Sequence, residues 1–276
     1  MAILTPLSGP EARALGAAYG LETEGVRGIP AGSVNSNFAL ELAGGGRAFL
    51  RVYEEQGMEG AAREVRLLEH LATRGVGTPR PMARKDRRGT FATHAGKPVA
   101  VFPWVDGETA CQARVTRGRA RSVGAALAHV HLAGEGFDGL HAGRFGAEAL
   151  RGRLQRLPPQ ARGGDLGDAV AMLESRLAEA WRAEDASELP MGVAHGDLFR
   201  DNVLWQPRDD GAPGEHIAAL LDFESASRQP LVFDLAVTAL AWCFGDALEA
   251  PLLTALGEGY ASVRPLEGVR WRPCRR

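Results

Sequence analysis

The sequence is poor in the features that mark disulfide-stabilised or membrane-spanning proteins. Its three cysteines, Cys111, Cys243 and Cys274, are far apart and odd in number. They form neither a disulfide framework nor a metal knuckle and favour a reducing compartment. The most apolar stretch, residues 229–245, is too short to span a bilayer and is interrupted by Asp234. Since the N-terminus also lacks the basic region of a signal peptide, we expect a cytoplasmic protein with no membrane partner.

The sequence also lacks an excess of charge of either sign. Across 276 residues, 32 Lys and Arg oppose 34 Asp and Glu, which gives a formal net charge of −2. This balance argues against a nucleic-acid partner, and a hydrophobic content of 45% argues against a disordered chain. The length allows one large domain or two lobes, each with its own core.

The first hundred residues predict a small antiparallel sheet with one inserted helix. Ser8 and Glu11 have the spacing of a capping box and begin a helix that ends near Gly20. The other expected elements are a hairpin of strands 38–42 and 48–53, a helix over 59–73, a second hairpin around 86–89 and a strand over 98–102.

A loop rich in Gly, Ser and Asn, residues 28–37, precedes the first hairpin. Backbone N–H groups in such a loop can approach a phosphate closely. It is not a Walker A motif, because no Gly-Lys-Ser/Thr follows. Taken alone, the loop is better explained as a plain β-turn.

From about residue 113 the pattern becomes helical, with further helices expected over 145–157 and 166–183. Residues 104–107 are the expected link between the lobes. We therefore predict a first lobe over 1–103 and a second lobe over 104–276.

The most informative segment holds His195, Asp197 and Asn202 in a polar loop between two strand-like runs, followed by Asp222-Phe223-Glu224 after a buried-type strand. Phosphoryl transfer needs a carboxylate beside the attacking hydroxyl, and an amide and a carboxylate oxygen on Mg²⁺. The order and spacing match the protein-kinase pattern H-x-D-x-x-x-x-N followed by D-F-G, except that Glu224 replaces the glycine. Three unrelated turn residues in this order are improbable.

With Glu224 in place of the glycine, the two motifs resemble those of the aminoglycoside phosphotransferase and choline kinase superfamily. Further strings, among them residues 32–38, 49–54, 233–236, 241–244 and 259–266, resemble its bacterial homoserine kinase branch. The resemblance implies an α+β, protein-kinase-like two-lobed fold, with a small antiparallel sheet in the N-terminal lobe and a mostly helical C-terminal lobe.

The resemblance also implies roles for single residues. Asp197 matches the catalytic aspartate, His195 matches a histidine that braces the loop, and Asn202 and Asp222 match the Mg²⁺ ligands. Glu224 supports the second metal position or the loop itself. The remaining matches concern ATP: the phosphate-covering turn with Gly32, Ser33, Asn35, Ser36 and Asn37, the adenine hinge from Phe102 to Trp104, and Arg51 with its helix partner Glu64.

Arg51 stands where kinases place a lysine, and the two side chains are not interchangeable. The homoserine kinase branch also tends to lack this lysine, so the departure does not argue strongly against activity.

Other polar residues are better explained by structure than by chemistry. His129 and His131 point in different directions on a helix and make a poor metal pair. Asp234 matches a position that buttresses the active-site loop. Trp242 is better explained as part of a buried helix than as a wall of the substrate site. Cys243 is best explained as a small core residue.

We therefore expect an ATP- and Mg²⁺-dependent kinase of L-homoserine, a step of threonine biosynthesis. The alternatives are a related kinase acting on an aminoglycoside or choline, and a nucleotide-binding pseudokinase. Oligomeric state stays open, as does the cation for the acceptor carboxylate, among Arg51, Arg200, Arg228 and Arg264. Residues 267–276 have no helical periodicity and no match to the family, so we expect a truncated or frameshifted terminus and uncovered apolar surface on the second lobe.

Overall fold

The structure is a computed structural model that describes residues 3–30, 34–143, 146–182, 189–207 and 214–265. The predicted irregular terminus, residues 267–276, lies outside this range. The chain forms two compact units, one of residues 1–115 with 200–224 and the other of residues 116–199 with 225–276. The boundary between residues 103 and 104 stays a prediction.

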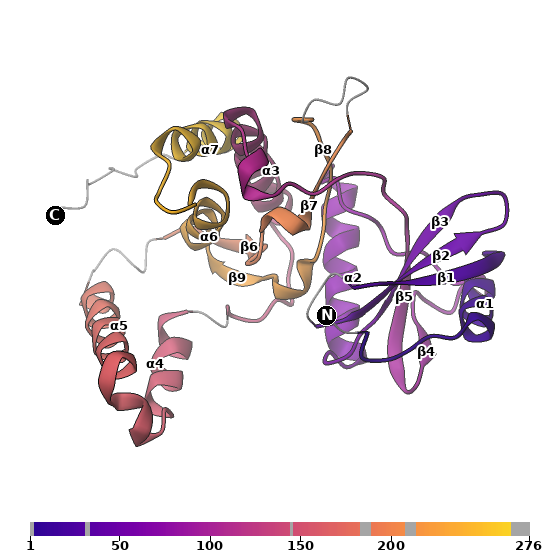
Figure 1. The fold of residues 1–276 in the computed structure, drawn as a ribbon, viewed down its shortest axis with the longest axis horizontal. Helices are drawn as coiled ribbons and strands as arrows, with labels where there is room; N and C mark the ends of the chain where they lie inside the picture. The colour runs from indigo at the N-terminus through magenta and orange to yellow at the C-terminus, as the bar shows by residue number, and fades with distance from the viewer. Residues whose placement is uncertain (1–2, 31–33, 144–145, 183–188, 208–213, 266–276) are drawn as a thin grey trace. The chain divides into compact units, whose positions relative to one another are not determined.

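The first unit contains the predicted antiparallel sheet, with strand order β1-β2-β3-β5-β4 (Figure 1). Its strands are β1 (Thr23–Ile29), β2 (Ser36–Leu42), β3 (Arg47–Val52), β4 (Ala92–His94) and β5 (Lys97–Pro103). Helices α1 (Gly9–Ala18) and α2 (Met58–Thr73) and the hairpin of β7 (Val203–Trp205) with β8 (Ile217–Leu220) complete the unit.

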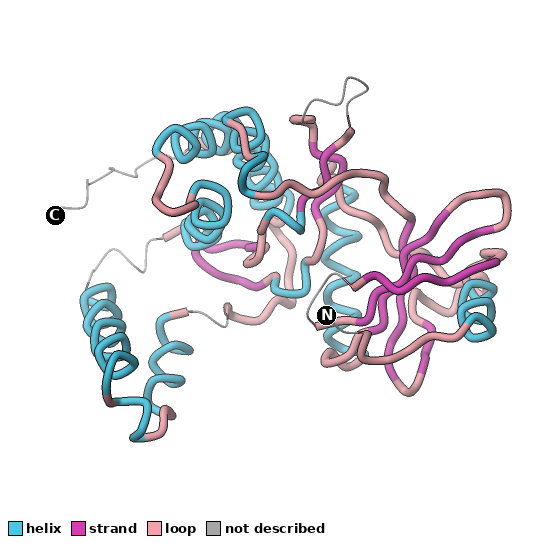
Figure 2. The backbone as a smooth tube through the Cα atoms, in the orientation of Figure 1, coloured by secondary structure: helices cyan, strands magenta, loops and turns pink. Residues whose placement is uncertain are grey.

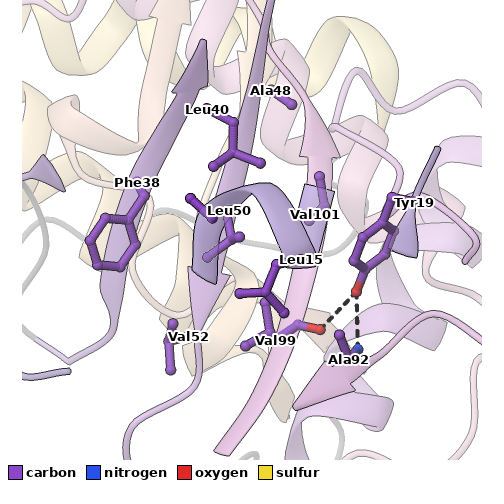
Figure 3. Packing of buried hydrophobic residues seen from close by; sticks show 11 residues of the cluster. Leu15, Tyr19, Phe38, Leu40, Ala48, Leu50, Val52, Ala92, Val99 and Val101 are labelled. Carbon is purple, nitrogen blue, oxygen red and sulfur yellow. Dashed lines mark hydrogen bonds between the residues drawn. The ribbon is translucent and has the colours of Figure 1, made fainter. Parts of the chain in front are cut away.

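Helix α1 begins as its sequence predicts. The capping box is present, and the Ser8 N–H donates to Glu11 Oε2 at 2.9 Å. The helix places Leu15 and Tyr19 against Leu40, Leu50 and Val101 of the sheet (Figure 3). The Tyr19 hydroxyl lies 3.0 Å from the Val99 carbonyl and accepts from the Ala92 N–H at 3.1 Å. One hydrophobic cluster of this unit therefore lies between α1 and one face of the sheet.

Two details of the sheet differ from the sequence-based prediction. Strand β1 was not predicted, because Gly25 and Gly28 interrupt it and most of its side chains are half-buried or exposed. The second hairpin turns at Ala95 and Gly96, with positive φ values of 49° and 76°, whereas residues 86–89 form only a loop turn. Two consecutive positive φ values suit the twist of a tight hairpin.

The second unit is mostly helical, as predicted (Figure 2). Its helices are α3 (Arg117–Ala133), α4 (Ala147–Gln155), α5 (Gly164–Arg182), α6 (Leu231–Cys243) and α7 (Ala250–Val263). A two-stranded antiparallel sheet joins β6 (Met191–Ala194) to β9 (Ser227–Pro230). None of the described helices has the length and apolar composition needed to cross a membrane.

Helices α3 and α7 pack unusually closely. A Cβ at Gly124 would lie 2.0 Å from the Leu256 carbonyl oxygen, and one at Gly259 would lie 2.0 Å from the Arg121 carbonyl oxygen. Both distances are far below van der Waals contact, so glycine at each position allows the two backbones to approach. This contact brings Tyr260 of α7 to His131 of α3.

Candidate functional site

In the first unit, one buried arginine joins two carboxylates from distant parts of the chain. Arg51 Nη1 of β3 lies 3.0 Å from Glu64 Oε1 of α2 and 3.2 Å from Asp222 Oδ1, which follows β8. The expected pair of Arg51 with Glu64 is therefore formed, and Asp222 is added to it. The side chains of Arg51 and Glu64 are only 9% and 4% exposed, so solvent screens their attraction weakly.

These buried groups shift each other's proton affinity. Burial alone would lower the pKa of Arg51, but Glu64 and Asp222 outweigh it and raise that pKa, so the guanidinium stays charged. Burial raises the pKa of Glu64, although Arg51 acts in the opposite direction. The hydroxyl of buried Tyr53 has a pKa well above its usual range, first because of burial and then because of Glu64. Tyr53 is therefore a neutral member of this cluster.

The hairpin of β7 and β8 brings the two predicted metal ligands to one end. Val203 pairs with Leu220, and the Leu221 N–H donates to the Asn202 carbonyl at 2.9 Å. Asn202 therefore precedes one strand at the place where Asp222 follows the other. Asp222 has a φ of 62°, a left-handed conformation that is uncommon outside glycine and typical of functional positions.

Asn35 connects the segment before β2 to the residue pair after Asp222. Its Nδ2 donates to Glu224 Oε2 at 2.5 Å, and its Oδ1 accepts from the Glu54 N–H at 3.1 Å. Both ends of the amide are thus used within the unit. Sequence reasoning placed Asn35 in a phosphate-covering turn and did not find its contact with Glu224.

The structure places the other residues predicted for that turn in different surroundings. Gly32 and Ser33 lie outside the described residues. Ser36 is fully buried at the start of β2, where its hydroxyl donates to Glu54 and accepts from the Leu4 and Thr5 N–H groups at 2.9 and 3.0 Å. Asn37 is opposite Arg51 in the β2–β3 register.

The predicted adenine hinge lies at the end of β5. Phe102 is buried and meets Phe49 edge-on, with ring centroids 6.0 Å apart. The Trp104 Nε1–H donates to Asp106 Oδ1 at 3.1 Å, and the Arg47 guanidinium lies 4.4 Å from the Trp104 ring centre. Since Arg47 also pairs with Asp106 at 2.7 Å, three side chains hold this segment.

In the second unit, α6 holds the backbone of the loop that carries Asp197. Asp234 accepts from the His195 N–H at 2.7 Å and from the Gly196 N–H at 2.9 Å. The Trp242 Nε1–H donates to the Leu198 carbonyl at 2.9 Å. The loop is therefore anchored to one helix on both sides of Asp197, and the expected buttressing role of Asp234 is present.

A buried histidine supports Asp234 in turn. His131 Nε2 lies 3.0 Å from Asp234 Oδ2, and His131 Nδ1 lies 2.7 Å from the Tyr260 hydroxyl. Burial alone would raise the pKa of Asp234, but the hydrogen bond from His131 and the charges and N–H groups around it lower the pKa below its ordinary value. Asp234 is thus ionised and fully paired at neutral pH.

Comparison of the chain with known proteins assigns it to a family. A model of the phosphotransferase enzyme family matches residues 25–266. The chain belongs to this family. A homoserine kinase of Methylocella silvestris is 33% identical over 273 residues, covering 98% of this chain and 81% of its own length. A homoserine kinase of a Caulobacter species is 36% identical over 274 residues, covering 96% and 81%.

Solved structures of phosphotransferases share the fold. An amicoumacin kinase in complex with AMP-PNP, Ca²⁺ and amicoumacin has a TM-score of 0.70 at 13% identity, covering 91% of this chain and 77% of its own. A microcompartment-associated aminopropanol kinase has a TM-score of 0.69 at 19% identity, covering 93% and 81%. The predicted kinase-like α+β fold is confirmed.

Sequence reasoning missed the role of His131 in this phosphotransferase. The spacing of His129 and His131 argues against a metal pair and predicts no other contact for His131. A signal was present, because His131 continues the buried positions Val123 and Leu127 at intervals of four residues along α3. A histidine on a buried helical face needs polar partners, which Asp234 and Tyr260 supply.

Proposed function

We propose that this phosphotransferase transfers the γ-phosphoryl group of ATP to the hydroxyl group of L-homoserine. The observation that carries the proposal is the ordered set of Asp197, Asn202 and Asp222 in a chain of this family. The acceptor is supported by relatives named homoserine kinase that are 33% and 36% identical over nearly the whole chain. Retention of all three residues argues against the pseudokinase alternative.

Asp197 is proposed to orient the acceptor hydroxyl and to accept its proton. A carboxylate can do this only when its backbone is held in place, because a small displacement of a reacting group greatly slows a reaction. Asp234 and Trp242 hold the residues on either side of Asp197, which supports this role. His195 is proposed to brace the loop, since its ring lies 3.3 Å from the Asp197 N–H.

The residues at the base of the β7–β8 hairpin fit a magnesium ion. Mg²⁺ prefers oxygen ligands and is commonly held by one or two protein groups together with substrate phosphates and water. Asp222 Oδ1 is buried and accepts no well-aligned hydrogen bond from the described residues, although Arg51 lies 3.2 Å away. Asn202 and Asp222 are therefore proposed as the ligands, and the bound ion would neutralise phosphate charge. The described residues include no larger group of His, Cys, Asp and Glu that could hold a metal.

Arg51 is proposed to contact the phosphates of ATP. Its Nε–H is buried without a hydrogen-bond partner among the described residues, which leaves a donor for a phosphate oxygen. Glu64 would hold the guanidinium in position. The nucleotide site is proposed to be completed by the turn of Gly32, Ser33, Asn35, Ser36 and Asn37, whose backbone N–H groups would cover the phosphates, and by the segment from Phe102 to Trp104 beside adenine.

Substitution of the proposed catalytic and metal residues tests this assignment. We expect Asp197→Asn to lower kcat with L-homoserine by about 10²- to 10⁴-fold, because the proton acceptor is lost. We expect Asp222→Asn to abolish turnover at ordinary Mg²⁺ concentrations. ADP release measures both effects, and circular dichroism checks the fold.

Asp201→Asn is the matched control, since Asp201 is an exposed carboxylate of the same loop. It should retain the activity of the unchanged protein. Near-normal turnover by the folded Asp197→Asn variant would contradict the mechanism, and so would equal losses in Asp197→Asn and Asp201→Asn.

A further inference from the structure

The segment of residues 3–6, which precedes α1, contacts the strands before and after Asn35. A Cβ at Gly28 of β1 would lie only 2.1 Å from Ile3 Cδ1, so the Ile3 side chain lies directly over the backbone of Gly28. On β2, the Ser36 hydroxyl accepts from two N–H groups of the segment, at 2.9 and 3.0 Å. The segment therefore contacts β1 before Asn35 and β2 immediately after it.

The carboxylate of Glu54 joins this segment to the sheet. Its side chain is 3% exposed and accepts from the Thr5 hydroxyl at 3.0 Å and from the Ser36 hydroxyl. The Lys97 ammonium, at the start of β5, pairs with the same carboxylate and donates to the Thr5 hydroxyl at 2.9 Å. Burial alone would raise the pKa of Glu54, but these three donors lower it below its ordinary value. The carboxylate is therefore ionised and held from three sides.

The backbone of Glu54 continues these contacts towards the proposed magnesium site. Its N–H donates to Asn35 Oδ1 at 3.1 Å, and Asn35 Nδ2 donates to Glu224 Oε2 at 2.5 Å. Glu224 lies two residues after Asp222, a proposed magnesium ligand. An uninterrupted line of contacts thus runs from residues 3–6 to the neighbours of the metal site.

Stability alone does not explain these contacts. A buried ion pair seldom stabilises a fold more than apolar side chains of the same size would. Hydrogen bonds, in contrast, have preferred directions and so define one position for each partner. The contacts of Glu54 therefore give Asn35 and Ser36 one arrangement relative to the sheet.

We propose that Glu54 is a positioning residue that holds Asn35 in place for the binding of Mg²⁺ and nucleotide. Residues 3–6 act through it, because the Thr5 hydroxyl fixes the Glu54 carboxylate. Glu54 does its work through Asn35 and Glu224 and without touching the nucleotide. This role rests on the proposed function, since it concerns the same nucleotide site.

Binding of MgADP, measured by isothermal titration of the full chain, tests this role without an acceptor. Glu54→Gln keeps the shape of the side chain but replaces one oxygen with an N–H₂ group, which cannot accept from the donors around it. We expect MgADP to bind about tenfold more weakly. The KM for MgATP should rise by a similar factor, while kcat and the KM for L-homoserine stay unchanged. Glu55→Gln is the matched control, because Glu55 is the exposed carboxylate next in the chain, and it should bind MgADP as the unchanged protein does.

A double-mutant cycle separates positioning from a general loss of stability. Thr5→Val removes the hydroxyl that contacts Glu54 but keeps the shape of the side chain, and it should weaken MgADP binding by about threefold. Since Thr5 acts through Asn35, the double variant Thr5→Val/Asn35→Ala should bind MgADP no more weakly than Asn35→Ala alone. Thr93→Val, at an exposed threonine of β4, should leave MgADP binding unchanged.

MgADP binding at the unchanged affinity by folded Glu54→Gln or Thr5→Val would overturn the proposed role. Additive losses in the double-mutant cycle would also overturn it, because Thr5 and Asn35 would then act independently. Failure of the proposed function would appear differently, as MgADP binding by the unchanged protein without phosphorylation of L-homoserine.

Discussion

The side-chain amide of Asn35 positions Glu224, and these contacts leave it poorly placed to bind a ligand. Its amide contacts Glu224 through Nδ2 and the Glu54 backbone through Oδ1. Glu54 in turn is bonded to Ser36, Thr5 and Lys97. The segment after Asp222 is therefore tied, through one amide, to a buried polar network of the sheet.

Replacing this amide with a carboxylate should weaken nucleotide binding. In Asn35→Asp, two carboxylates would face each other at the former 2.5 Å contact with Glu224, which would displace the residues beside Asp222. We expect the KM for MgATP to rise by about tenfold in steady-state assays. Asn35→Ala removes the bond without repulsion and should show a smaller rise. An unchanged KM in Asn35→Asp would contradict the positioning role.

For single residues, the sequence predicts membership of the candidate site better than it predicts the contacts that each residue makes. The spacing of Asp197, Asn202 and Asp222 identified the candidate site, because these residues lie in continuous motifs. The contact between Asn35 and Glu224 spans 189 positions and depends on the fold of the whole unit. Arg51 shows the same limit: Glu64 was expected as its partner, whereas its contact with Asp222 was not.

At the scale of elements, the contact between α3 and α7 sets the geometry around His131 and Tyr260. Both helices carry a glycine where the other backbone passes closely. The close approach places the His131 ring edge-on to Tyr260, with centroids 5.5 Å apart. The support for the loop around Asp197 thus begins with the packing of two helices.

Alanine at these glycines should destabilise the protein. We expect Gly124→Ala and Gly259→Ala each to lower the free energy of unfolding by about 1–3 kcal/mol, because the added methyl group would overlap a backbone carbonyl. Urea denaturation followed by circular dichroism measures the change.

Gly257→Ala is the matched control in the same helix, since a Cβ there meets no atom within 4 Å. Because alanine has a higher helix propensity than glycine, this substitution should raise the free energy of unfolding by about 0.5–1 kcal/mol. Equal effects of Gly257→Ala and Gly259→Ala would show that propensity, rather than packing, controls α7.

Elements with strong periodicity or clear end signals could be predicted, and the others could not. Helix α1 has a capping box, and α2 has one buried face, so both were expected close to their observed bounds. Strand β1 has neither an apolar run nor a regular alternation, and its place at the sheet edge comes from pairing with β2. Tertiary pairing of this kind leaves little trace in the local sequence.

At the scale of the whole molecule, the second unit exposes large apolar side chains on and after α6. Leu240 is 62% exposed, and Val232, Phe244 and Leu248 are each about half exposed. Single exposed apolar residues are ordinary, but several in neighbouring segments favour association. The uncovered apolar surface expected for the second lobe stays a prediction.

The protein should therefore self-associate in a concentration-dependent way, because association would bury these side chains. Light scattering after size-exclusion chromatography measures the mass at several protein concentrations. Leu240→Lys should shift the distribution towards monomer without loss of activity. A single monomeric species of the unchanged protein at all concentrations would contradict this prediction.

The kinase-like fold was predictable because its motifs occur in a fixed order along most of the chain, and the family match over residues 25–266 agrees with it. The assignment of residues 200–224 to the first compact unit was not predictable from that order. It depends on backbone pairing, such as the bond of 2.7 Å from the Leu220 N–H to the Gly77 carbonyl after α2.

The acceptor is the central claim of this account, and steady-state kinetics test it most directly. ADP release with ATP and Mg²⁺ should be compared for L-homoserine, L-serine, L-threonine and choline. We predict the highest kcat/KM for L-homoserine, with formation of O-phosphohomoserine. A higher kcat/KM for any other alcohol, or ATP binding without turnover on all four, would contradict the account.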